Sequence, residues 1–141
     1  MQPREGALLD LVRRWTEKAD KDFALAEHLA AEGCCYCEAI GFNSQQAAEK
    51  YLKALLVFHQ VAFPRTHSLG ELLDLVHTAQ PAIAEYLRDV TALNPYGVEY
   101  RYPGDFPDMS QEEALTALGL ASKVRDAVVP ILRPLLQDPA R

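Results

Sequence analysis

Apolar residues recur at helical spacing over the first part of the chain. Residues 7–32 contain neither proline nor glycine. In this segment an apolar position returns every three or four residues, at Leu8, Leu11, Trp15, Ala19, Ala26 and Leu29. That period places them on one face of a helix, so the pattern predicts a long amphipathic helix. The charged residues between them, which include Arg14 and Lys18, are interpreted as its solvated face.

A second helix is predicted from about Tyr36 to about His59, with Gly33 as the stop of the first and with Gly41 inside the second. Its apolar positions again follow helical steps. The segment 61–67, with the sequence VAFPRTH, then breaks the pattern, because Pro64 disfavours helix at the preceding residue and lacks an amide donor. We therefore expect a loop there.

Two capping boxes mark later helix starts. Ser68 is followed three residues on by Glu71, and Ser110 by Glu113, a spacing that satisfies backbone donors at a helix N-terminus. Between these two helices, Pro81 suits the first turn of another. Within the last helix, two prolines are expected to bend or end it, at Pro130 and Pro134.

These patterns together predict five helices and no strand. We expect an all-α fold, an up-and-down bundle of about five helices, built as a single domain over residues 1–141. The Pro- and Gly-rich connection over residues 94–108 is longer than a bundle needs. Long ordered loops often hold function, so this segment is a candidate site region.

The composition of the chain limits its expected ligands and cellular location. Apolar residues make up 49% of the chain, and the formal charge of -6 works against non-specific attraction to nucleic acid. No apolar run nears the ~20 residues that span a bilayer, and the N-terminal segment has charges where a signal peptide needs an apolar core. We expect a cytoplasmic protein with no membrane contact.

The sequence contains no motif that is typical of a cofactor or metal site. The three cysteines, Cys34, Cys35 and Cys37, are too clustered for a disulfide framework and lack a second ligand pair for zinc, so they are interpreted as small apolar fillers. No phosphate loop, Rossmann glycine pattern or nucleophile elbow occurs. No metal and no cofactor are expected.

The second predicted helix carries a polar edge. Gln46, Lys50 and Lys53 lie within about one turn of each other, and Gln45, Glu49 and Lys53 form a second row at four-residue spacing. One interpretation is an exposed face with an ordinary Glu49–Lys53 ion pair, which contributes a few tenths of a kcal/mol. The other is a binding edge.

Asp22 falls on the apolar stripe of the first helix, seven residues after Trp15 and four before Ala26. A carboxylate there is unfavourable unless it is paired. Lys50 and Arg101 are the candidate partners. We expect a structural ion pair rather than a catalytic acid, because local spacing places no second carboxylate beside it.

Two further residues could bind a ligand. His67, at the start of the third helix, can hydrogen-bond the preceding loop or face a cleft. Arg101 stands among Tyr96, Tyr100 and Tyr102, a combination that suits a phosphate or a stacked base and equally a carboxylate inside the protein.

The chain resembles the HEPN domain family over nearly its whole length. The resemblance is carried by Trp15, Ala19, Asp22 and Ala26, by the strings NSQQAAEKYLKALL at 43–56 and RTHSLGELL at 65–73, and by YRYPGD at 100–105. It implies an up-and-down helical bundle, a homodimer, and pairing with a minimal nucleotidyltransferase in a toxin–antitoxin-like system. Many members are metal-independent endoribonucleases whose signature is an arginine followed, after four to six residues, by a histidine.

This sequence departs from that signature. After Arg101 the corresponding positions are Phe106, Pro107 and Asp108, and none of the four histidines follows an arginine at that spacing. Our first hypothesis is therefore a HEPN-type subunit that binds nucleotide or RNA phosphate.

The residues assigned to that binding are Arg101, Lys50, His67, Gln46 and Tyr102, with Asp22 and Glu49 as structural polar residues. The alternatives are an endoribonuclease toxin with a variant active site, whose catalytic residues are not assigned, and a purely structural dimerisation module.

Overall fold

The computed structural model describes residues 3–33, 36–98 and 108–137, and within them every regular element is a helix. The elements are α1 (Pro3–Glu32), α2 (Cys37–Phe58), α3 (Leu69–Ala79), α4 (Pro81–Tyr86), a 3-10 helix η2 (Arg88–Leu93), α5 (Asn94–Val98) and α6 (Gln111–Leu136). The all-α prediction is confirmed. None of the described helices combines the length and apolarity that a membrane crossing requires.

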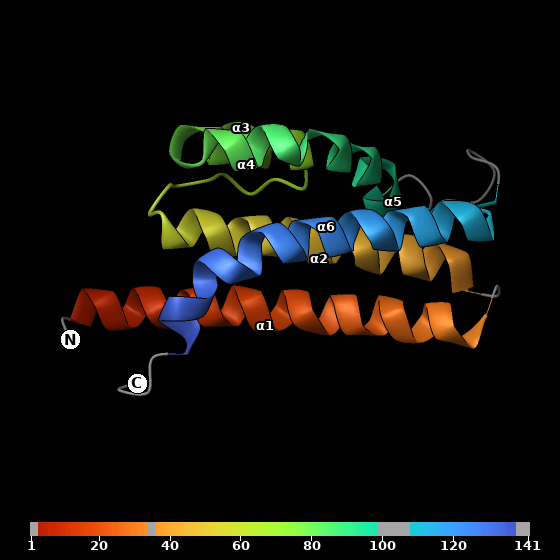
Figure 1. The fold of residues 1–141 in the computed structure, drawn as a ribbon, viewed down its shortest axis with the longest axis horizontal. Coiled ribbons are helices and arrows are strands. Elements are labelled where there is room, and N and C mark those ends of the chain that lie inside the picture. The colour runs from red at the N-terminus through yellow and green to blue at the C-terminus, as the bar shows by residue number, and fades with distance from the viewer. Residues whose placement is uncertain (1–2, 34–35, 99–107, 138–141) are drawn as a thin grey trace.

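Helix α2 lies at the centre of the bundle. It packs most extensively on α1 and on α6, and it also contacts α3, α5 and η2. In Figure 1, α1 covers one side of α2, and α3 and α4 lie on the opposite side. Because α2 has neighbours on several sides, its apolar residues form the middle of the core, with Tyr51, Leu52, Leu55 and Leu56 fully buried. Polar residues of α2 are consequently enclosed as well.

The fourth predicted helix is divided in the structure. Helix α4 ends at Tyr86, and the chain continues as the 3-10 helix η2 and then as the short helix α5. Leu87, Val90 and Leu93 are fully buried and stand three residues apart. A 3-10 helix has three residues per turn, so it turns all three toward the core. The prediction of a connection from Asn94 onward is wrong for Asn94–Val98, which is helical.

Helix α6 has the predicted start and contains two prolines. Both halves of the predicted capping box are present, between Ser110 and Glu113. The helix continues through Pro130 and Pro134 to Leu136, so the prolines do not end it. Each proline removes a backbone hydrogen bond and favours a bend. Figure 1 shows the C-terminal part of α6 turning toward α1, where Arg13 Nη2 donates to the carbonyl of Leu136 at 3.4 Å.

A second, smaller apolar cluster closes the other end of α1 and α2. It contains Ala26, Cys37, Ile40, Met109 and Ala114. Cys37 is buried among these side chains, in line with its interpretation as an apolar filler, whereas Cys34 and Cys35 lie outside the described residues.

The glycine inside α2 has a packing role in this cluster. A Cβ atom at Gly41 would lie 2.6 Å from Met109 Cε and 3.3 Å from Tyr96 Cγ. Gly41 therefore leaves the space that these two side chains occupy.

Candidate functional site

One side of α2 carries a buried polar row. Gln45, Glu49 and Lys53 are only 1%, 2% and 6% exposed. The interpretation of this row as an exposed face is wrong. Sequence spacing places the three residues on one side of the helix, but only the packing of neighbouring segments decides that this side is covered.

The Glu49 carboxylate has three polar neighbours. Lys53 Nζ donates to Oε2 at 3.0 Å, and Gln45 Nε2 donates to Oε1 at 3.2 Å. His67 Nδ1 lies 3.1 Å from Oε1. A buried carboxylate is tolerated only when it is paired and hydrogen-bonded, and Glu49 meets both conditions.

Gln45 extends this buried network to its neighbours. Its Nε2 also donates to the backbone carbonyl of His67 at 3.3 Å, and its Oε1 accepts from Gln46 Nε2 at 2.7 Å. The row therefore ties α2 to the segment that precedes α3. Three of the predicted polar residues, Gln46, Glu49 and His67, meet here. His67 is nevertheless 75% exposed along its side chain, so its imidazole borders solvent.

Lys53 connects the network to an aromatic pair. Its Nζ lies 5.3 Å from the ring centroid of Trp15 and 5.9 Å from that of Phe63. The two rings meet edge to face at 6.3 Å. Because Lys53 is buried, the indole face that it covers is turned into the protein. A cation over an indole is attracted by the ring quadrupole, which fixes the orientation of Trp15.

On the side of α2 that faces α1 there is an ion pair that is more exposed than the Gln45–Glu49–Lys53 row. Lys50 Nζ donates to Asp22 Oδ2, and the two side chains are 21% and 22% exposed. Asp22 thus has Lys50 as its partner, one of the two candidates from the sequence. One residue further along α2, the buried Tyr51 donates its phenol hydrogen to Asp20 Oδ1. Burial, and then this hydrogen bond and the charge of Asp20, raise the pKa of Tyr51 well above its usual range.

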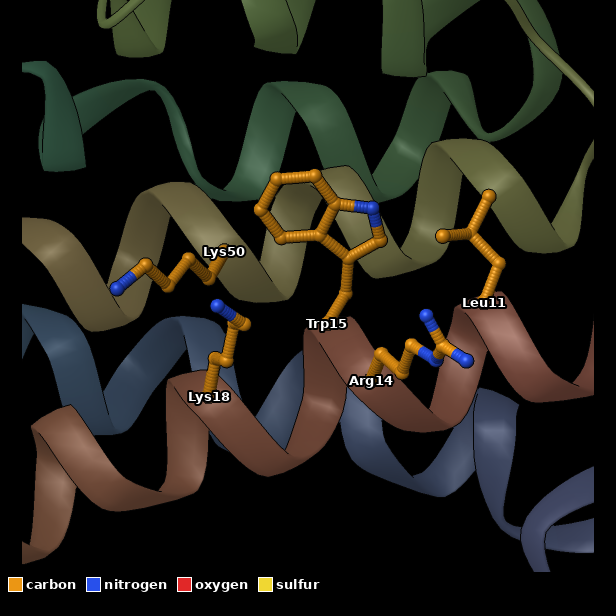
Figure 2. A pocket seen from close by; sticks show the side chains of 5 residues that line it. All are labelled: Leu11, Arg14, Trp15, Lys18 and Lys50. Atoms are coloured by element: carbon orange, nitrogen blue, oxygen red, sulfur yellow. The ribbon is translucent and has the colours of Figure 1, made fainter.

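A pocket of about 280 Å³ lies between α1 and α2 at this contact. Leu11, Arg14, Trp15, Lys18 and Lys50 line it. Figure 2 shows the Trp15 indole face-on, with Arg14 and Leu11 to one side of the ring and with Lys18 and Lys50 to the other. A protein of formal charge -6 therefore gathers three cationic side chains around a single indole.

Two of the three cations at the pocket are exposed, and the third is paired with a carboxylate. Arg14 Nε pairs with Asp10 Oδ2 at 2.9 Å, but the two side chains are largely exposed, and such a surface pair contributes little. Lys18 is exposed. Lys50 is the cation whose ion pair with Asp22 a ligand would have to exchange.

Of the predicted binding residues that the structure describes, Lys50 alone lines this pocket. Gln46 and His67 contact the Gln45–Glu49 network instead, and Arg101 and Tyr102 lie outside the described residues. Sequence reasoning did not assign Trp15, Arg14 or Lys18 to a site. A signal was present, since Arg14 and Lys18 are four residues apart and therefore neighbours on one face of α1, next to Trp15. Among the described residues, no group of histidine, cysteine and carboxylate side chains suits a metal.

Comparison with known proteins identifies the family. The family model of the HEPN domain matches residues 12–132. Among solved structures, the chain is similar to the crystal structure of an archaeal HEPN homologue, with 26% sequence identity and a TM-score of 0.67. The match covers 86% of this chain and 97% of the homologue. A comparison with curated proteins finds none that matches. Both the sequence match and the shared bundle lead to one conclusion: this chain belongs to the HEPN domain family.

Proposed function

We propose that this HEPN-family protein binds a nucleotide through its phosphate in the pocket between α1 and α2. The observation that carries the proposal is the grouping of Arg14, Lys18 and Lys50 around Trp15 in a chain that is acidic as a whole. Lysine and arginine side chains are the usual partners of phosphate oxygens, and their hydrogen bonds to it are charge-assisted. Local positive charge in an acidic protein thus favours the binding of phosphate at this pocket over other parts of the surface.

The indole supplies the second half of the recognition. Bases stack on aromatic side chains, each with about 1–3 kcal/mol of stabilisation. Lys53 and Phe63 contact Trp15 from within the protein, and these contacts favour the orientation of the ring that a base would meet. A phosphate beside a base defines a nucleotide, whereas inorganic phosphate would use the cations alone.

Trp15 also makes the proposal directly testable. It is the only tryptophan of the chain, so tryptophan fluorescence reports on this pocket alone. Titration with AMP is expected to change the emission saturably, while adenosine and inorganic phosphate bind more weakly. An emission that AMP leaves unchanged at millimolar concentration sinks the proposal.

A matched pair of lysines on α1 supplies the control. Lys18→Gln removes a charge that lines the pocket, whereas Lys21→Gln removes an equal charge three residues away that does not. We expect Lys18→Gln to weaken AMP about tenfold, the size of one lost charge-assisted hydrogen bond, and Lys21→Gln to weaken it less than twofold. If the two variants weaken AMP equally, AMP responds to the overall charge of α1 and not to a specific contact with Lys18.

Arg101 requires a separate test because it lies outside the described residues. If the connection before α6 contributes to the same site, as its arginine and tyrosines suggest, Arg101→Ala weakens AMP about tenfold. An unchanged affinity removes Arg101 from the site, and Tyr102→Ala tests its neighbour in the same way.

Family membership supports a wider proposal. The protein acts in the cytoplasm as a single domain over residues 1–141, forms a homodimer, and pairs with a minimal nucleotidyltransferase in a toxin–antitoxin-like system. Light scattering is expected to give twice the 15.7 kDa mass of one chain. Co-expression with such a nucleotidyltransferase encoded beside this chain is expected to yield a complex on size exclusion. Separate elution of the two proteins would contradict the pairing.

A further inference from the structure

The charges of the pocket stand at two ends. Figure 2 shows the Arg14 side chain running toward Leu11, away from Lys18 and Lys50, with the indole of Trp15 between the two groups. Arg14 and Lys18 are one helical turn apart on α1, so their backbone positions are separated by about 6 Å along the helix axis. The two groups of cations thus offer two separate positions for anionic groups.

Each end has the donors for a separate phosphate. At the first end, Lys18 and Lys50 come from different helices and lie on the same side of Trp15. At the second end, the guanidinium of Arg14 has parallel donors that match two phosphate oxygens. Its pair with Asp10 is exposed and exchangeable.

The chemistry that matches this arrangement is a base flanked by two phosphates. In a nucleotide phosphorylated on both the 5′ and the 3′ oxygen, the phosphates leave opposite sides of the ribose and the base projects from the sugar. Resting on the proposed function, we infer that the pocket takes a nucleotide with phosphates on both sides of its ribose. The base lies over Trp15, one phosphate binds Lys18 and Lys50, and the other binds Arg14.

Two sources carry this chemistry: a free nucleoside 3′,5′-bisphosphate, and an internal nucleotide of single-stranded RNA. The experiment uses adenosine 3′,5′-bisphosphate and a four-residue oligoadenylate as its two arms, read by Trp15 fluorescence. Tight binding of both identifies the RNA chain as an acceptable source, and rejection of the oligoadenylate alone restricts the site to the free bisphosphate. In either case, we expect the bisphosphate to bind at least about tenfold more tightly than AMP.

ADP is the control for total charge. It carries two phosphates like the bisphosphate, but both are on the 5′ side of the ribose and so reach the same end of the pocket. Arg14→Gln is expected to bring the bisphosphate down to the affinity of AMP, a loss of about tenfold, while it changes AMP and ADP by less than about twofold. Lys21→Gln, an equal loss of charge on the same helix outside the pocket, is expected to leave the ratio between the bisphosphate and AMP unchanged.

The outcomes separate this inference from the proposed function. If AMP binds and the bisphosphate binds no more tightly, or if Arg14→Gln weakens ADP as much as the bisphosphate, the two-ended site is overturned and the nucleotide pocket stands. If neither ligand changes the emission of Trp15, both are overturned. Far-ultraviolet circular dichroism of Arg14→Gln confirms that its helices are intact, so a loss of binding is not a loss of fold.

Discussion

Two neighbouring residues of α2, Glu49 and Lys50, face environments that differ in kind. Glu49 is buried and has three polar neighbours, which are Lys53, Gln45 and His67. Lys50 borders solvent and its ion pair is with a single carboxylate. The two sides of one helix thus present a buried carboxylate with three polar neighbours and a partly exposed ion pair with one.

The difference indicates which charges hold the fold and which can bind a ligand. Removing one partner of a buried pair leaves an uncompensated charge in a place that water does not reach. The Lys50–Asp22 pair is partly exposed, so water screens it more than the Glu49 network and an incoming anion can reach the Lys50 ammonium. We therefore assign stability to the Glu49 side and ligand binding to the Lys50 side, and four variants can break or sharpen that division.

The largest effect is expected at Glu49. Glu49→Ala leaves the buried ammonium of Lys53 without its carboxylate and should lower the free energy of unfolding by about 3–5 kcal/mol. Urea denaturation measures it. Glu38→Ala, at an exposed position of the same helix, is the control and should remain within about 1 kcal/mol. A loss at Glu49 as small as that at Glu38 would show that the network does not hold the fold.

Tyr51 tests the buried contacts on the α1 side. Tyr51→Phe removes the hydrogen bond to Asp20 and should lower the free energy of unfolding by about 1–1.5 kcal/mol, since Asp20 itself is exposed. The raised pKa of Tyr51 predicts that its contribution is complete below the ordinary tyrosine pKa of about 10 and is lost as pH rises above it. Denaturation at pH 8 and above pH 10 should show a decline in wild type that exceeds the decline in Tyr51→Phe.

Lys50→Gln should separate the two roles. Since Lys50→Gln leaves the Asp22 carboxylate, which is only 22% exposed, without its cation, we expect a loss of stability of about 1 kcal/mol, well short of that at Glu49, together with a loss of AMP affinity of about tenfold. Thermal melting and Trp15 fluorescence measure the two quantities on one sample. A strongly destabilised variant that binds AMP normally would reverse the assignment of the two sides.

Asp22→Asn gives the smallest expected effect, and in the opposite direction. The variant removes the carboxylate that competes with phosphate for Lys50, so AMP should bind about threefold more tightly, a gain of under 1 kcal/mol. Glu17→Gln, an exposed change of equal charge on α1, should change the affinity less. If Asp22→Asn weakens AMP instead, Asp22 contacts the ligand rather than competing with it.

Much of this fold follows from local sequence, and the exceptions have physical reasons. The Ser110–Glu113 capping box and the apolar steps of α1 and α2 are encoded within a few residues, and the structure has them. The 3-10 helix over Arg88–Leu93 was missed, because buried residues three apart fit the start of an α-helical pattern equally well. Charge alone marked the Gln45–Glu49–Lys53 row as solvated, whereas its burial depends on segments far along the chain.

The candidate site was predictable only in part for the same reason. Lys50 stood out within α2, and its pairing with Asp22 was one of two open alternatives. Arg14 and Lys18 instead looked like any solvated face, because a helix pattern does not tell that Lys50, more than thirty residues later, lies across from them. When two helices line a pocket, the periodicity of each helix shows which of its residues share a face. It does not show that the two faces meet.

We assign the ligand site to the pocket between α1 and α2 that Lys50 lines. A crystal structure with bound AMP tests this assignment most directly. We expect the adenine over the indole of Trp15, the phosphate between Lys18 and Lys50, and the Asp22 carboxylate released from Lys50. A nucleotide bound elsewhere on the protein, with Lys50 still paired to Asp22 and the pocket unchanged, would contradict the account.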